Sequence, residues 1–174
     1  DVRAADYYIH HFIDKKYGGV FWTLDHEGCM KDATKQTYAC AFGIYGLAEH
    51  FRATGDRRSL DTALKLYDTL EKKVHDKSGS GYVESFQRDY SKASMKGVDG
   101  QVDATKTMNT HIHLLEAFTT LYQVWPDKGL RDNLKELLGI LRTRLYSPQR
   151  AHLILFCDDS WNPIGETDSY GHTT

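Results

Sequence analysis

The sequence predicts an all-α fold built from pairs of helices, and three observations support this prediction. Apolar residues recur at helical spacing in five segments, and short extended segments rich in aromatic and β-branched residues separate alternate helices. The extended segments follow one another at intervals of roughly 60 to 70 residues. Because a single helix pair cannot bury its own apolar face, stacked pairs must close into a ring or continue as an open solenoid. We expect a closed double layer of helices around a central cavity, and an open solenoid is the alternative.

The first two helices are predicted over 2–16 and 33–54. The sequence YGG ends the first apolar pattern and TGD ends the second, since glycine commonly follows the last residue of a helix. The apolar positions that define these two helices are Tyr8, Ile9, Phe12, Ile13, Tyr38, Phe42, Tyr45 and Phe51.

Three further helices complete the prediction. The third begins after Asp56, a residue type preferred as an N-cap. The fourth covers about 104–125 and ends at WPD, and the fifth covers 128–145. The third and fifth each carry one apolar stripe, formed by Leu60, Ala63, Leu64, Tyr67, Leu70 and Val74 and by Leu130, Leu134, Leu137, Leu138, Leu141 and Leu145. The chain therefore supplies about five helices, and we expect His172 to lie at the start of a sixth.

The extended segments are GGVFWTLDHEG at 18–28, SGYVESFQRDY at 80–90 and HLILFCDDSWNP at 152–163. Each begins with aromatic or β-branched residues and continues into acidic or polar ones, which is typical of a short strand followed by a turn. We expect all three to gather at one end of the helices, where their aromatic side chains suit the rim of a pocket.

Composition limits the possible functions. Hydrophobic residues make up 40% of the chain and charged residues 26%, which favours one globular domain over 1–174. The formal net charge of −2 gives little support for nucleic-acid binding, and no apolar run approaches the ~20 residues that cross a bilayer. With no such run and no signal peptide, a cytoplasmic location is the default expectation. Cys29, Cys40 and Cys157 are odd in number and far apart, which favours reduced thiols.

Four sequence blocks carry a resemblance to a known family. YGGVFWTLDHEG, KQTYACAFGIYGLAEHFRATGD, MNTHIHLLEAFTTLYQVWPD and FCDDSWNPI followed by SYGH resemble, in this order, the N-acylglucosamine 2-epimerase superfamily, and most closely its members that act on β-1,4-linked disaccharides. The resemblance implies an (α/α)6 barrel, a cytoplasmic isomerase that acts on a small carbohydrate, and no metal or organic cofactor. Because such a barrel needs twelve helices, we expect this chain to be a fragment of a catalytic domain about twice as long.

The fourth helix carries two candidate substrate-binding residues. At 100° per residue, one face is polar and the opposite side is apolar. The polar face carries Lys106, Asn109, His113, Glu116 and Thr120, and the apolar side carries Met108, Ile112, Leu115, Phe118, Tyr122 and Trp125. Periodicity alone assigns the polar face to solvent. The resemblance instead implies that Asn109 and His113 contact the sugar.

Two neighbours of these residues are open to two interpretations each. His111 falls on the apolar side, which favours a packed core histidine. Glu116 either holds His113, three residues before it, or is an ordinary surface charge of the helix.

Three more residues complete the candidate site. Tyr38 corresponds to a family tyrosine that binds sugar hydroxyls, although its apolar neighbours also allow a core position. Trp22 either stacks on a sugar face or closes the core. His172 corresponds to the general acid/base of the family, but the glutamate expected three residues later is missing because the sequence ends in GHTT.

The chemistry implied by the resemblance suits these residue types. Epimerisation at C2 of an aldose removes the proton next to the C1 aldehyde and forms a cis-enediolate. Histidine, with a pKa of roughly 6.5, can accept and donate that proton near neutral pH. Asn109 and His113 are candidates to stabilise the developing oxyanion. The two histidines of THIHL lie about 200° apart on a helix, which argues against a shared metal.

The alternatives come from different classes of protein. Within the superfamily, the chain could belong to an N-acylglucosamine 2-epimerase or to an aldose-ketose isomerase acting on mannose. Glycoside hydrolysis needs two carboxylates that flank the bond, and the adjacent Asp158 and Asp159 tend to diverge. A helical-repeat interaction protein without enzyme activity is the third class. The family's second catalytic histidine and a substrate-binding arginine fall outside these residues, so we expect the 174 residues alone to be inactive.

Overall fold

Helices make up most of the structure, which confirms the predicted all-α class. The computed structural model describes residues 2–92, 104–149 and 151–164. The α-helices in this part of the chain are α1 Val2–Tyr7, α2 Thr37–Thr54, α3 Arg57–Lys73, α4 Met108–Val124 and α5 Lys128–Ile140. α1 and α5 continue into π-helical stretches at Tyr8–Phe12 and Leu141–Leu145.

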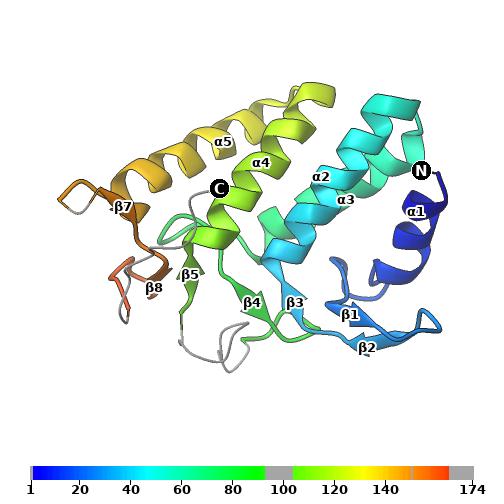
Figure 1. The fold of residues 1–174 in the computed structure, drawn as a ribbon, viewed down its shortest axis with the longest axis horizontal. Coiled ribbons are helices and arrows are strands. Elements are labelled where there is room, and N and C mark those ends of the chain that lie inside the picture. The colour runs from blue at the N-terminus through cyan, green and yellow to red at the C-terminus, as the bar shows by residue number, and fades with distance from the viewer. Residues whose placement is uncertain (1, 93–103, 150, 165–174) are drawn as a thin grey trace.

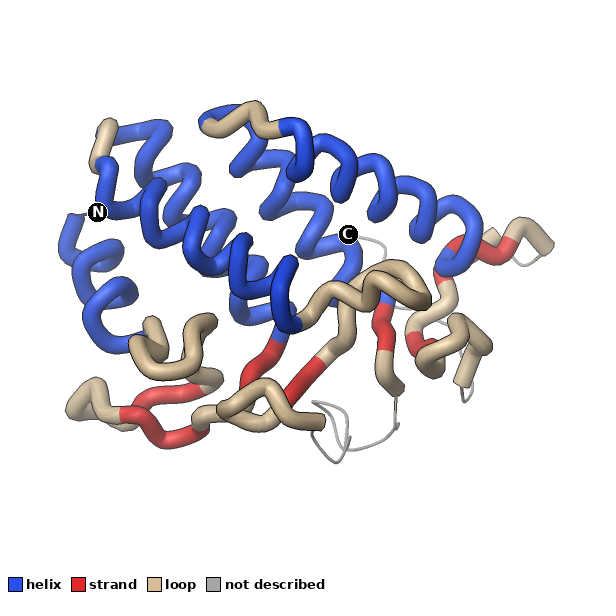
Figure 2. The backbone as a smooth tube through the Cα atoms, turned by 180° about the vertical axis from the view of Figure 1, so that it is seen from behind, coloured by secondary structure: helices blue, strands red, loops and turns tan. Residues whose placement is uncertain are grey.

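The helices pack as neighbouring pairs. α2 and α4 lie side by side, α3 packs against α2, and α5 packs against α4 (Figures 1 and 2). Their shared core contains fully buried side chains from all four helices, including Ile44, Leu70, Leu114, Phe118, Leu121, Leu130 and Leu137. Each such side chain contributes about 1.5–3 kcal/mol through removal of apolar surface from water, which holds α2 and α4 in a fixed relative position.

Short strands gather at one end of the helices (Figure 1). They form four antiparallel pairs: β1 Thr23–Leu24 with β2 Met30–Asp32, β3 Lys35–Gln36 with β4 Ser85–Phe86, β5 Lys106–Thr107 with β8 Phe156–Cys157, and β6 Tyr146–Ser147 with β7 His152–Leu153. β3 leads directly into α2 and β5 leads directly into α4. Each of these two strands therefore ties the start of a central helix to the extended segment that follows the next helix.

The three extended segments share one turn, which confirms their equivalence. The N–H of the first turn residue donates to the carbonyl four residues later, at Asp25, Gln87 and Asp158. The residue three positions after each of these donates back to it and has a positive φ, at Gly28 (81°), Tyr90 (67°) and Trp161 (67°). The same backbone path is thus built three times with different side chains.

The structure corrects several predicted boundaries. The first helical segment ends at Phe12 and not at residue 16, because the side chain of Asp14 accepts the N–H groups of Lys16 and Tyr17 and forms a turn. The helices predicted over 33–54 and 104–125 begin later, at Thr37 and Met108, because their first residues form β3 and β5. The third helix begins as predicted, with Asp56 accepting the N–H of Arg58 at 3.0 Å.

A buried lysine precedes each central helix. Lys35 donates to Asp14 at 2.9 Å, and Lys106 donates to Asp76 at 2.8 Å and to the carbonyl of Asp159 at 2.9 Å. Both lysine side chains are almost fully buried, so each ammonium depends on its carboxylate for compensation. Each pair joins the turn after one helix to the strand that leads into the next helix.

The predicted polar face of the fourth helix is partly wrong. Lys106 belongs to β5 and is buried against Asp76. Thr120 is buried together with Ala117, one turn earlier on α4. The residues buried by α4 are Met108, Thr110, His111, Leu114, Ala117, Phe118, Thr120 and Leu121. Ile112, Leu115, Tyr122 and Trp125 are only half-buried, so the buried face is rotated relative to the predicted one.

His75 connects α3 to α5. Its Nδ1 lies 3.0 Å from Glu71 Oε2, and its Nε2 lies 3.1 Å from both carboxylate oxygens of Glu136. Carboxylates only accept hydrogen bonds, so both ring nitrogens carry protons and the ring is an imidazolium. Burial disfavours this charged form, but the hydrogen bonds to Glu136 and Glu71 raise the pKa of His75 from 6.5 to about 9.

This bridge predicts stability that is lost at alkaline pH. A histidine whose folded pKa is raised stabilises the fold fully below its unfolded pKa of about 6.5 and loses that contribution as pH rises through about 9. Urea unfolding should therefore show His75→Gln to be more destabilising at pH 6 than at pH 10, by on the order of 1–3 kcal/mol. The same change at the exposed His10 serves as the control. An equal loss at both pH values would contradict the bridge.

Two further observations concern the described residues as a group. None of their helices combines the length and apolar composition that a bilayer crossing requires. The three cysteines are free thiols, with Cys29 exposed and Cys40 and Cys157 buried. Burial raises the pKa of the Cys40 and Cys157 thiols to about 11, which keeps them protonated near neutral pH.

Candidate active site

Three of the predicted site residues meet where α2 and α4 begin. The rings of Tyr38 and His113 lie 5.3 Å apart at 68°, and those of Trp22 and Tyr38 lie 6.2 Å apart at 60°. All three side chains are half-buried, so each keeps part of its surface accessible. Tyr38 comes from the first turn of α2, His113 from the second turn of α4, and Trp22 from the first extended segment.

Phe42 joins this cluster, although no pattern in the sequence marks it as a site residue. Its ring lies 4.9 Å from Tyr38 and 4.8 Å from His113, and 43% of its surface is exposed. The available signal was its spacing, because residues four apart on a helix share a face. In the sequence, Phe42 serves only as one of the apolar positions that define the second helix.

Glu116 contacts His113 directly. His113 Nδ1 donates to Glu116 Oε2 at 2.8 Å, across one turn of α4. Because the carboxylate can only accept, this bond fixes the proton on Nδ1 and leaves Nε2 for another partner. Of the two alternatives for Glu116, the geometry favours the one in which it orients His113, and a role in the reaction stays a prediction.

Asn109 lies one turn before His113 on α4 and is exposed. Its position depends on the helix start, where the hydroxyl of Thr107 accepts the N–H of Thr110 at 3.1 Å. Asn109 and His113 therefore project from the same side of α4, as predicted.

His111 is a core histidine, which confirms its prediction. Its Nδ1 donates to the carbonyl of Thr107 at 2.7 Å, and its Nε2 accepts the N–H of Tyr82 at 3.1 Å. Burial lowers the pKa of His111 to about 4, so the ring is neutral at pH 7. It ties α4 to the second extended segment and is fully satisfied. His172, the predicted acid/base, lies outside the described residues.

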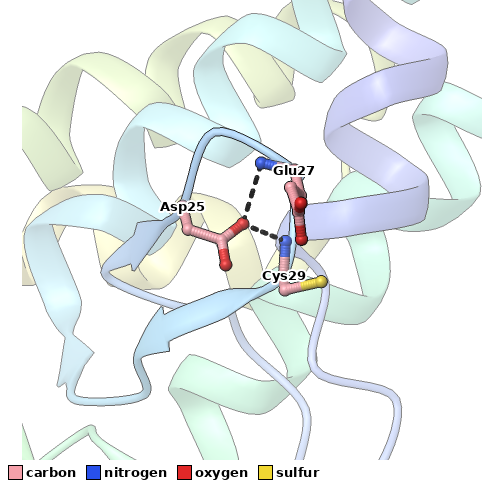
Figure 3. Close-up of side chains that lie close together, drawn as sticks. All are labelled: Asp25, Glu27 and Cys29. Carbon is pink, nitrogen blue, oxygen red and sulfur yellow. Dashed lines mark hydrogen bonds between the residues drawn. The ribbon is translucent and has the colours of Figure 1, made fainter.

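One group of potential metal ligands occurs among the described residues, in the turn between β1 and β2 (Figure 3). Asp25, Glu27 and Cys29 offer ligand atoms within 4.8 Å of one another. Asp25 Oδ1 accepts the N–H groups of Glu27 and Cys29 at 3.0 and 2.8 Å (Figure 3). Asp158 makes the same two bonds in the equivalent third turn. The shared turn explains why these side chains are close, and nothing else in the geometry points to a metal.

Comparison with known proteins identifies the family. The model of the N-acylglucosamine 2-epimerase (GlcNAc 2-epimerase) family matches residues 3–172. The chain belongs to the N-acylglucosamine 2-epimerase family. This match includes each of the predicted site residues and all three extended segments.

Several similar proteins are named cellobiose 2-epimerase. The chain is 40% identical over 171 residues to a cellobiose 2-epimerase of Bacteroides fragilis, covering 98% of this chain and 44% of that protein. It is 38% identical over 171 residues to a cellobiose 2-epimerase of Ruminococcus albus, covering 98% of this chain and 43% of that protein. The solved cellobiose 2-epimerase of Bacillus thermoamylovorans superposes with a TM-score of 0.87 at 34% identity, covering 92% of this chain and 42% of that one.

The epimerase family gives the described helices their architectural setting. The structural neighbours are (α/α)6 barrels, and the helices described above form part of such a barrel. The chain spans less than half the length of the relatives it matches. α2 and α4 are adjacent helices of the barrel, and the cluster of Trp22, Tyr38, Phe42 and His113 lies on them and on the segment beside them.

Proposed function

We propose that the protein containing this chain is a sugar 2-epimerase that interconverts the reducing-end glucose and mannose of β-1,4-linked disaccharides such as cellobiose. The observation that carries this proposal is the contact of Tyr38 with both Trp22 and His113, in a chain 40% identical to a cellobiose 2-epimerase. Aromatic rings offer apolar faces to a pyranose, and the phenol and imidazole beside them offer hydrogen bonds to its hydroxyls.

The roles of the substrate-binding residues follow from their chemistry. Asn109 can donate through its amide to the C1 or C2 oxygen, where negative charge develops. His113 donates its Nδ1–H to Glu116, so its Nε2 can accept a hydrogen bond from a sugar hydroxyl, or donate one when the ring is protonated. Tyr38 adds one hydroxyl beside them, and Trp22 adds an apolar surface for the ring.

His172 is proposed as one of two acid/base groups. A base removes the C2 proton, and the electrons of that bond move toward the C1 carbonyl oxygen to give the cis-enediolate. A second acid returns a proton to the opposite face of C2, and the carbonyl re-forms. The reaction needs no net oxidation. Histidine suits both steps because its ordinary pKa lies near 6.5. The partner histidine implied by the family resemblance falls outside these 174 residues.

Exchange with solvent tests the function. The full-length protein, incubated with cellobiose in D2O without added cofactor, should form glucosyl-mannose and place deuterium at C2, as measured by NMR and mass spectrometry. Deuterium at C1 of a ketose product would instead indicate an aldose-ketose isomerase, and turnover restricted to N-acylglucosamine would indicate that branch of the family. Failure to detect C2 exchange with cellobiose would sink the proposed reaction.

The setting of the reaction is part of the same proposal. A cytoplasmic location is supported by three cysteines that stay unpaired, two of them buried in the fold. The proton-transfer route uses side chains alone, so we propose that neither a metal nor an organic cofactor takes part. A helical-repeat interaction protein is the alternative, and it would bind a macromolecule and show no turnover in the exchange experiment.

A further inference from the structure

Glu84 is a buried carboxyl group that the proposed reaction does not use. It lies in the second extended segment, directly before β4, and only 6% of its surface is exposed. Burying a carboxyl group costs free energy unless hydrogen bonds compensate for the lost water. The contacts of Glu84 therefore indicate what it is for.

The main chain of Glu84 joins the starts of the two central helices. Its carbonyl accepts the N–H of Thr37, the first residue of α2, at 3.0 Å. Its N–H donates to the carbonyl of Thr105, directly before β5, at 2.9 Å. Glu84 therefore contacts both strand-to-helix junctions that lead to the candidate site, and Tyr38 directly follows Thr37 in the first of them.

The side chain of Glu84 acts on the N-cap of α4. Thr107 donates its hydroxyl proton to Glu84 Oε2 at 2.6 Å, and the same hydroxyl oxygen accepts the N–H of Thr110 at 3.1 Å. The bond to Glu84 thus points the hydroxyl hydrogen away from the helix and leaves a lone pair for the cap. Asn109 lies two residues after this cap.

The repeat itself does not require a carboxyl group at this position. In the third extended segment, Leu155 makes the equivalent main-chain bond, accepting the N–H of Met108 at the start of α4 at 2.9 Å. An apolar side chain is sufficient there. The carboxyl of Glu84 is therefore additional to the fold's recurring pattern, and its partner is the cap of the helix that carries Asn109 and His113.

We infer that Glu84 is a positioning residue, which holds the N-terminus of α4 through Thr107 and so fixes Asn109 and His113 relative to Tyr38 on α2. This inference rests on the proposed function for its kinetic consequences. Its structural consequence, a firmly held first turn of α4, does not depend on the identity of the substrate.

The kinetic experiment uses full-length protein and cellobiose, at a temperature well below unfolding. Glu84→Ala should lower kcat/KM by on the order of tenfold to a hundredfold, because small displacements of binding groups are costly to catalysis. The kcat/KM of Glu84→Gln should stay within about threefold of wild type, since the amide oxygen can still accept from Thr107. Burial raises the pKa of Glu84, so it already disfavours the charge that this variant removes. Thr107→Val should lose at least as much as Glu84→Ala, because it removes the hydrogen bond to Glu84 and also the oxygen that accepts the N–H of Thr110. The double variant should be no worse than Thr107→Val alone, because both changes remove the same bond between Glu84 and Thr107.

Tyr67→Phe provides the matched control. It removes the acceptor of a hydrogen bond between α3 and α5, from Asn133 to the Tyr67 hydroxyl at 2.8 Å, away from the start of α4. It should lower thermal stability and leave kcat/KM unchanged. If Glu84→Ala loses stability but keeps kcat/KM in the same way, or if the losses from Glu84→Ala and Thr107→Val simply add, the positioning role is wrong.

Hydrogen exchange separates this inference from the proposed function. Amides of residues 108–111 should exchange faster in Glu84→Ala than in wild type, and those in the middle of α5 should not change. If the wild-type protein shows no epimerase activity, the proposed function fails while this measurement still decides the role of Glu84. Unchanged exchange at 108–111 would overturn the inference whatever the activity.

Discussion

Replacing Asp14 by alanine should destabilise the protein by about 3–5 kcal/mol, because it leaves a buried ammonium group without its carboxylate partner. Lys35 donates to Asp14 Oδ2 at 2.9 Å, and only 1–2% of either side chain is exposed. Arg88 also donates to this carboxylate, through Nε at 2.9 Å. Urea or thermal unfolding of the full-length protein measures the loss.

Two variants keep this prediction testable if Asp14→Ala does not fold. Asp14→Asn removes the charge but retains an oxygen that can accept the turn N–H groups of Lys16 and Tyr17. It should therefore lose less stability than Asp14→Ala. The double change of Asp14→Leu with Lys35→Met should recover stability relative to Asp14→Ala, because no buried charge remains. Asp132→Ala, which breaks an exposed pair with Lys128, should leave the unfolding midpoint unchanged. A loss no larger than that control would contradict the buried-pair argument.

The pair of Asp14 and Lys35 also predicts how stability changes at acid pH. Burial opposes ionisation of Asp14, but the hydrogen bonds from Arg88 and Lys35 outweigh it and hold the pKa of this carboxyl well below its usual range. A lowered folded pKa means that the stabilisation is present above the ordinary value of about 3.9 and is lost as pH falls below it. The protein should therefore keep this contribution through the neutral range, unlike the His75 bridge, which weakens as pH rises.

The helical class and the repeat were predictable because they depend on local patterns. Apolar periodicity and the Asp56 cap identified α3 closely, and the recurrence of the extended segments identified the three equivalent turns. The boundaries before α2 and α4 were missed because β3 and β5 form only with partners about 50 residues away in the sequence. Lys106 was misplaced for the same reason, since its partner Asp76 belongs to the preceding turn.

The candidate site was predictable in part. Asn109, His113 and Tyr38 are predicted from the family resemblance, and their role stays a prediction. The structure places Trp22 beside Tyr38 and Glu116 beside His113. Phe42 and Glu84 were missed. Phe42 looks like a core residue in an apolar helix pattern, and the burial of Glu84 depends on contacts with Thr37, Thr105 and Thr107 that no local spacing reveals.

His113→Ala should lower kcat/KM of the full-length protein by about a hundredfold to a thousandfold, if the proposed reaction is correct. Loss of one preorganised hydrogen-bonding group at a developing oxyanion typically costs this much. The fold should tolerate the change, because His113 is half-buried and its hydrogen bond goes to the exposed Glu116. Equal unfolding midpoints for variant and wild type would show that the loss is not one of stability.

Glu116 distinguishes a positioned imidazole from an imidazole that is merely present. Glu116→Gln should lower kcat/KM much less than His113→Ala, by about threefold to tenfold, since a hydrogen bond to an exposed carboxylate is weak and its main effect is to favour one tautomer. Because Glu116 acts through His113, adding Glu116→Gln to His113→Ala should cost nothing further. His10→Ala, an exposed change on the first helical segment, should leave kcat/KM as in wild type. An equal loss from Glu116→Gln in the presence and absence of His113 would mean that the 2.8 Å contact between them does not orient the ring.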